Sequence, residues 1–382
     1  MKRLLAIGTI LLVCGAAIGP RISASRMSRP DRSRLSFRHD HAGAHTWWDA
    51  EWSIAPARGG RIGIIVGAAV CGGDAFLLDR QLAALHHADL RRGAIVGDLA
   101  AGAAGTSAFR EVIGLAADCE RRTLFVVDFT GVVVVDMDGG QIVRRFAKPQ
   151  GFVNSVGTPV VDAAAQALYV PGLWPAASAD WLVKPIDRMF EGDHVGYRLD
   201  LASGQTSPMV AAVEQGCWSL GPNCLYASLD AVSGGGWIAA HQVGSLVGVY
   251  DRSLRLVRTI DVRSQLFLET GERNGSQTLD RMVAWNEDNS VIRNAYAFGD
   301  RIVTVHSFNR TRGWQPGKRT DFQVFMNVHT MDGAGVASDI RLPDLPVGRD
   351  ATSLYVVDYG SGGRRAIGAD PIALLRVPAA RD

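Results

Sequence analysis

Short apolar segments recur at a regular spacing along this chain of 382 residues. Six of them are five-residue phrases that share one pattern, a run of apolar or β-branched residues ending at a turn. They read AFLLD (75–79), LFVVD (124–128), LYVPG (168–172), WIAAH (237–241), IVTVH (302–306) and LYVVD (354–358). Repetition at this spacing predicts an array of small sheets rather than one continuous sheet, and it indicates a six-bladed β-propeller.

The second repeat shows most clearly how one blade is built. VIGLAAD (112–118) alternates like a half-buried strand, and LFVVD, GVVVVD (131–136) and QIVRRF (141–146) follow it. The dipeptide Asp138-Gly139 suits the tight turn between the last two strands. Four antiparallel strands per blade are therefore expected. The other five blades are predicted at 61–99, 158–204, 225–262, 294–344 and 345–379.

The sixth blade is short and lacks a fourth strand at the C-terminal end of the chain. The segment TWWDAEWSIA (46–55) can supply that strand from the N-terminal side. Closure of this kind removes a sheet edge and locks the ring. The sequence thus predicts an all-β domain over 46–382, a six-bladed β-propeller closed by an N-terminal strand.

Two segments carry a resemblance to a known family. GDAFLLDRQLAALHHADL (73–90) and FREVIGLAADCERRTLFVVDFTGVVVVDMDGG (109–140) resemble the bacterial six-bladed β-propeller family related to NHL repeats. The resemblance extends over most of 46–379, although blades 3 to 5 replace the strand-ending aspartate with Gly172, His241 and His306. It implies the fold and no particular reaction, because activities in that family are largely unassigned.

The N-terminal segment resembles a leader for export. Lys2 and Arg3 precede an apolar stretch, 4–18, that is short for a membrane span, and small residues near 22–24 offer a cleavage site. Residues 1–24 are predicted to be a signal peptide or an N-terminal anchor, with lipidation of Cys14 as a further alternative. The arginine-rich segment 25–45 is expected to be a disordered tether, and the protein to be periplasmic or extracellular.

An exported chain can form disulfides, and four cysteines follow Cys14. Cys71 and Cys119 occupy equivalent turns of successive blades, and Cys217 lies close to Cys224 in the sequence. We expect the pairs Cys71–Cys119 and Cys217–Cys224; four buried thiols are the alternative.

Composition and motifs exclude some classes of function, but they do not identify one. The formal net charge of +2 gives no general field for binding nucleic acid. The sequence contains no G-x-S-x-G elbow, H-E-x-x-H or phosphate-binding loop. Two long insertions, 173–194 and about 264–290, both emerge on the face where the second strand of each blade ends, here called the top face. Loops on a rigid scaffold often carry binding residues, so Trp174 and Trp181 are candidate binding residues.

The residues that end the six phrases form a second set of candidates on this face. Aspartates there are expected to accept backbone N–H groups of the following turn. His241 and His306 could share a metal or act as acid and base, or they could cap turns. Where first strands begin, Glu111, Asn154 and Asn289 are similar to the oxygen ligands of gluconolactonase-like propellers, which suggests a divalent cation.

These observations predict an exported β-propeller that binds a small molecule, a peptide or an envelope protein through its top face. A metal-dependent, lactonase-like hydrolase or a lyase acting at the mouth of the central channel is the alternative. A structural scaffold is a third reading. The sequence does not decide whether the protein is an enzyme. The one cofactor that it suggests is the divalent cation that the hydrolase or lyase would need.

Overall fold

The computed structural model describes the part of the chain that forms the predicted propeller. The described residues are 47–100, 108–154, 158–174, 194–209, 227–232, 235–241, 244–253, 255–265, 267, 290–309, 322–359 and 368–379. They belong to one compact unit, residues 47–312 and 321–382, and all their regular secondary structure is β. The predicted leader and tether lie outside the described residues.

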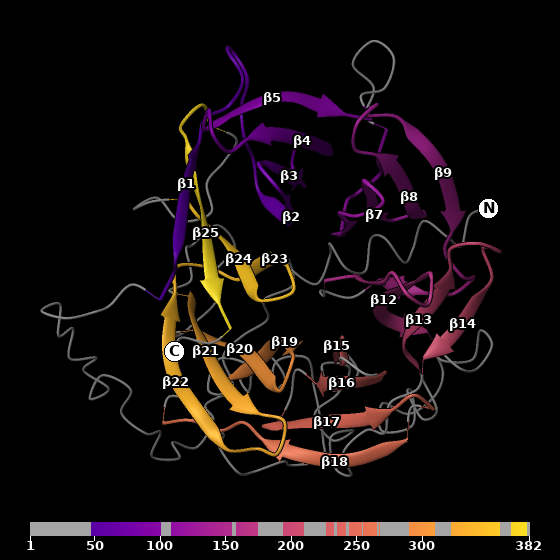
Figure 1. Cartoon of the computed structure of the whole chain (residues 1–382), viewed down its shortest axis with the longest axis vertical. Coiled ribbons are helices and arrows are strands. Elements are labelled where there is room, and N and C mark those ends of the chain that lie inside the picture. Colours follow the sequence, from indigo (N-terminus) through magenta and orange to yellow (C-terminus); the bar gives the residue numbers. More distant parts are fainter. Residues whose placement is uncertain are drawn as a thin grey trace, which may run out of the picture. The chain divides into compact units, whose positions relative to one another are not determined.

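In the described part of the chain, twenty-five strands form six antiparallel sheets that follow one another around a ring (Figure 1). Blade 1 consists of β2 (Ile65–Cys71), β3 (Asp74–Asp79), β4 (Ala84–Asp89) and β5 (Ala94–Leu99). Blade 2 consists of β6 (Gly114–Asp118), β7 (Thr123–Asp128), β8 (Gly131–Asp136) and β9 (Ile142–Ala147). The six-bladed all-β propeller predicted from the repeats is confirmed.

Blade 3 departs from the four-strand pattern, because its innermost strand is interrupted. Both β10 (Val153–Asn154) and β11 (Val160–Asp162) pair with β12 (Ala167–Trp174), which is followed by β13 (His194–Asp200) and β14 (Thr206–Met209). The sequence pattern predicts only the second of these two short inner strands.

Blades 4 and 5 follow the four-strand pattern. Blade 4 contains β15 (Ala227–Val232), β16 (Gly236–His241), β17 (Leu246–Asp251) and β18 (Leu256–Asp261). Blade 5 contains β19 (Val291–Phe298), β20 (Arg301–Asn309), β21 (Phe322–Thr330) and β22 (Gly335–Leu342). Blade 6 contains β23 (Pro346–Arg349), β24 (Ser353–Asp358) and β25 (Ile372–Pro378), and its fourth strand comes from the other end of the sequence.

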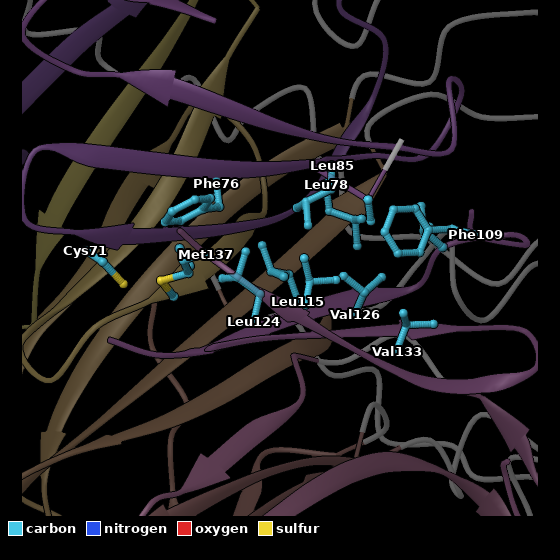
Figure 2. Close-up of a cluster of buried hydrophobic side chains, with 14 residues drawn as sticks. Cys71, Phe76, Leu78, Leu85, Phe109, Leu115, Leu124, Val126, Val133 and Met137 are labelled. Carbon is cyan, nitrogen blue, oxygen red and sulfur yellow. The ribbon is translucent and has the colours of Figure 1, made fainter. Parts of the chain in front are cut away.

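The hydrophobic core consists of six clusters, and each cluster lies between two neighbouring blades. Figure 2 shows the one between blades 1 and 2, where Phe76 and Leu85 meet Leu115, Leu124 and Val126. Equivalent clusters join blades 2 and 3, 3 and 4, 4 and 5, 5 and 6, and 6 and 1. The strands alternate so that successive residues face opposite neighbours, which is why both faces of the inner strands are apolar.

The ring closes as the sequence predicts. β1 (Ala50–Ile54) pairs antiparallel with β25, with Ser53 opposite Ala373. Ile54 is fully buried in the cluster between blades 6 and 1. Beyond the strand, the Trp47 indole N–H donates to the Pro378 carbonyl at 3.1 Å.

The same N-terminal segment also reaches blade 1. The Ala55 N–H donates to the Gly93 carbonyl, and the Ile95 N–H donates to the Ala55 carbonyl. Gly93 has a positive φ of 62°, and a Cβ there would lie 2.6 Å from the Ser53 carbonyl oxygen. Only glycine meets both conditions without strain, so the contact requires this residue.

A disulfide joins Cys71 and Cys119, confirming one of the two predicted pairs. It links the last residue of β2 in blade 1 to the turn after β6 in blade 2. The other predicted pair, Cys217–Cys224, lies outside the described residues.

Candidate functional site

The two faces of the propeller differ sharply in the length of their connections. On the bottom face, where first strands end and fourth strands begin, each connection spans two to five residues. On the top face, seven of the segments between strands of the described residues span ten residues or more: 55–64, 100–113, 175–193, 210–226, 262–290, 310–321 and 359–371. Long connections on a rigid scaffold often serve binding or catalysis. The top face is therefore the candidate functional face.

Aspartates at the ends of second strands organise the top face of blades 1 and 2. Asp79 is fully buried and accepts the N–H groups of Gln81 and Leu82, at 2.9 and 3.0 Å, in the following turn. It also accepts the Gly63 N–H at 2.5 Å, from the segment that leads into β2. Asp128 repeats the arrangement: its carboxylate accepts the backbone N–H of Gly131 in the following turn and the backbone N–H of Arg110 before β6, both at 3.1 Å. Each carboxylate thus joins its own turn to the segment that enters the blade.

In blade 1 this arrangement extends to a buried histidine. His86 on β4 lies between two carboxylates, with Nδ1 2.6 Å from Asp98 and Nε2 3.4 Å from Asp79. Burial disfavours the charged ring, but the hydrogen bonds to Asp79 and Asp98 outweigh it and raise the pKa of His86 to about 9. The imidazolium is therefore part of the folded structure at neutral pH.

His306, a residue singled out by the sequence, has the opposite environment. Its ring packs edge-on against Phe267 and face-on against Phe325, with centroids 5.5 and 5.6 Å away. It is 1% exposed, and neither ring nitrogen has a hydrogen-bond partner in the described part of the chain. His306 therefore does not cap a turn there, and that expectation is wrong for this residue.

His241 and His306 are not brought together. His241 shares its face of β16 with Trp237 and Ala239, which pack on Tyr169 of blade 3. His306 shares its face of β20 with Ile302, which packs on blade 4. The sheet of blade 4 therefore separates the two imidazoles. Among the described residues, no group of three or more His, Cys, Asp or Glu side chains is arranged to hold a metal ion.

The remaining candidates from the sequence fall into three groups, according to how much of each residue the structure describes. Glu111 is exposed on the top face with a positive φ of 44°, and its carboxylate lies 3.8 Å from Arg80. Asn154 and Trp174 are placed only by their backbones, in β10 and at the end of β12. Trp181 and Asn289 lie outside the described residues.

A buried ion pair, which the sequence analysis does not predict, lies near the bottom of the central channel. Asp230 on β15 of blade 4 contacts Arg349 on β23 of blade 6. The carboxylate is 1% exposed and the guanidinium 21% exposed. Burial raises the pKa of Asp230, while Arg349 and the N–H groups of Ala297 and Ala231 oppose that rise.

This pair also covers the inner edge of blade 5, which lies between its two partners. Asp230 accepts the Ala297 N–H at 2.8 Å, and Arg349 donates to the Ala297 carbonyl at 2.9 Å. Nearer the top, the Ser228 hydroxyl accepts the Ala295 N–H at 2.8 Å and donates to its carbonyl at 3.1 Å. Three side chains thereby satisfy four backbone groups that the innermost strand leaves unpaired within its own sheet. The guanidinium also lies over the Phe298 ring at 5.0 Å.

A signal for this pair does exist in the sequence. Asp230 and Arg349 are charged residues within short innermost strands, ASLDAV and PVGR, whose other members are mostly small or apolar. A charge at such a position is rarely fully buried unless it is paired. That reasoning predicts a partner for each residue, but it does not identify which one.

Comparisons with known proteins agree with the fold. No protein-family model matches the chain, and no curated protein matches its sequence. A member of the DUF4221 family from Bacteroides vulgatus is similar in structure over 86% of this chain and 96% of its own, with a TM-score of 0.57 at 10% identity. Regucalcin, a calcium-binding protein from Agrobacterium tumefaciens, covers 86% and 98%, with a TM-score of 0.45 at 12% identity. The first likeness shows the fold alone, and the second is too weak to support an argument. The described residues contain no helix that could cross a membrane.

Replacing His86 with glutamine should lower stability in a pH-dependent way. Because the folded-state pKa is raised from 6.5 to about 9, the stabilisation is complete below pH 6.5 and is lost as the pH rises through 9. The free-energy difference between wild type and His86→Gln should therefore fall by on the order of 3 kcal/mol between pH 6 and pH 9.5. Urea unfolding across this range measures it. His87→Gln, which alters the neighbouring histidine bonded to Asp74, is the control. A difference that does not change with pH would contradict a charged His86.

Replacing Arg349 with methionine should leave the Asp230 carboxylate buried and uncompensated. We expect a loss of about 3–5 kcal/mol in the free energy of unfolding at pH 7. The double variant Asp230→Leu/Arg349→Met removes both charges and should recover part of that loss, because the Ala297 N–H and carbonyl lose these two partners but no charge stays buried. Urea unfolding of the three proteins gives the comparison. A double variant as unstable as Arg349→Met would show that the ion pair does not account for the effect.

Proposed function

We propose that this protein is an exported binding protein that holds a small molecule, a peptide or an envelope protein on its top face. The observation that supports this most strongly is the asymmetry of the connections, with every connection of ten residues or more on one face. The ion pair of Asp230 and Arg349 lies toward the opposite end of the channel, which favours approach of a ligand from the top. The leader-like segment 1–24 supports export. A relationship to NHL-repeat propellers belongs to the same proposal and rests on the resemblance in blades 1, 2 and 6.

The described side chains of the top face offer both apolar and charged contacts. Phe129, between β7 and β8, is 54% exposed, and the Lys148 ammonium lies 4.1 Å from the centre of its ring. Burial lowers the pKa of Lys148, while Asp128 and Glu111 oppose that change. Glu111 and Arg80 form an exposed ion pair on the same side of blades 1 and 2. An aromatic ring beside paired charges is a common composition for a contact surface.

Photo-crosslinking in living cells tests whether the top face is the contact surface. A photoreactive phenylalanine analogue is placed at Phe129 or Arg80 on the top face, or at Arg91 or Arg255 in bottom-face turns, in the full-length chain. We expect discrete crosslinked products from the two top positions, found in the envelope fraction, and none from the bottom positions. Equal products from both faces, or a cytoplasmic protein, would contradict the proposal.

A small ligand would escape crosslinking, so native mass spectrometry of the purified protein accompanies the experiment. A bound molecule of constant mass supports the binding role when it is lost on replacement of Phe129 and Lys148 with alanine. Elemental analysis of the same sample tests the enzymatic alternative. About one equivalent of a divalent metal would favour the hydrolase or lyase over the binding protein.

A further inference from the structure

The contact between blades 4 and 5 differs from the other blade contacts in its polar content. Thr304 and His306 on β20 face blade 4, on the same side of the strand as Ile302. Asn327 and Phe325 on β21 lie opposite Thr304 and His306, and His329 lies opposite Ile302. These side chains therefore form one continuous strip along blade 5, which we call the blade 4–5 seam.

Most of the polar atoms in the blade 4–5 seam have no partner. The Thr304 hydroxyl, both ring nitrogens of His306 and Nδ1 of His329 are buried without a hydrogen bond within the described part of the chain. Near its upper end, the Ser264 hydroxyl is also buried and unpaired. Asn327 is the exception, since its amide donates to the Val262 carbonyl at 3.2 Å and accepts the Asp339 N–H at 2.8 Å. Each unpaired group weakens the closed seam, because water would satisfy it in an open one.

Two of the unpaired groups, His306 and His329, can take up a proton, so the stability of the seam depends on pH. Burial lowers the pKa of His306 to about 4, and the nearby charge of Asp339 opposes the change only in part. Burial likewise lowers the pKa of His329, against the charge of Asp261. Both rings are thus held neutral in the closed seam, whereas an exposed histidine takes up a proton near pH 6.5.

Among the described residues, the groups around the two rings offer little to stabilise a positive charge, and Arg258 on β18, which donates to the Met331 carbonyl at 3.4 Å, adds a positive charge on this side. Asp339 on β22 and Asp261 on β18 are the acidic groups that face them, and Asp261 is already paired with Arg263. The other packed strands contribute apolar residues to this cluster: Ile238, Ala240, Val247, Ile292, Ala295 and Ala297. Phe267, which covers the His306 ring, lies in the longest connection of the top face, 262–290.

We propose that the blade 4–5 seam is an acid-sensitive joint. It opens at its top end, so that water reaches His306 and Phe267 moves away from the His306 imidazole. The hydrogen bonds of Ser228 to Ala295 and of Asp230 to Ala297 hold the inner strands of blades 4 and 5 together during this opening. The opening is therefore local to the upper and outer part of the seam. It changes the top face at the root of its longest connection, so acidification alters that face while the ring stays closed. This inference does not depend on the identity of any ligand.

Hydrogen–deuterium exchange of the full chain at pH 7.0 and pH 4.5, corrected for the intrinsic effect of pH on exchange, tests the proposal. The His306 imidazole has a pKa of about 4 in the closed seam and would have one of about 6.5 in the open seam. The equilibrium constant for opening should therefore be about 50-fold larger at pH 4.5 than at pH 7.0. We expect amides at the upper ends of β20 and β21, in 305–309 and 322–326, to lose protection by that factor. Amides in 123–136 of blade 2 should keep theirs.

Two variants should abolish the response while a matched one preserves it. His306→Phe fills the same space without a titrating group, and His306→Leu serves if phenylalanine does not fit. In both, the change in protection between the two pH values should fall below about fivefold. His87→Phe removes a histidine that stacks on Phe76 but is bonded to Asp74, and it should respond like wild type. Loss of protection that is unchanged in the His306 variants, or equal in all blades, would overturn the proposal.

Discussion

Closure of the ring is the constraint on which the rest of this structure depends. Each blade buries one face against each neighbour, so an open ring would leave two apolar sheet faces exposed to water. The five pairs between β1 and β25 prevent this by joining the two ends of the sequence within one blade. The contact of Ala55 with Gly93 and Ile95 then ties that blade to blade 1. With the ring fixed, the inner strands lie close enough for Asp230 of blade 4 to reach Arg349 of blade 6.

Buried histidines have their hydrogen bonds satisfied in blade 1 but not in blade 5. In blade 1, His86, Asp79 and Asp98 satisfy one another, and the Asp79 carboxylate also holds two segments of backbone. In blade 5, His306 occupies an apolar site with no partner among the described residues. The same residue type is thus charged and stabilising in one blade and neutral and costly in another, because only the first has carboxylates within hydrogen-bonding distance. The long connections and the upper end of the blade 4–5 seam both lie at the top face.

The sequence predicts the features that repeat, and it fails for those that depend on contacts between blades. Alternation within 112–146 gives the strands of blade 2, and equivalent turn positions give the Cys71–Cys119 disulfide. The pairing of Asp230 with Arg349 joins residues 119 apart, and no local pattern specifies it. His241 and His306 show a different limit. Equivalent positions in adjacent blades face the same way, so one sheet must lie between them, and the repeat itself argues against a shared site.

The most direct measurement of ring closure is engineered disulfide formation between β1 and β25. In the observed register Ser53 lies opposite Ala373, and residues directly opposite in an antiparallel pair have Cβ atoms about 4.5–5.5 Å apart. The double variant Ser53→Cys/Ala373→Cys should form a new disulfide under mild oxidation, identified by mass spectrometry of its peptides. The pair Ser53→Cys/Leu374→Cys, shifted by one residue, should not. A bond in the shifted pair alone, or in neither, would show that this strand does not close the ring as described.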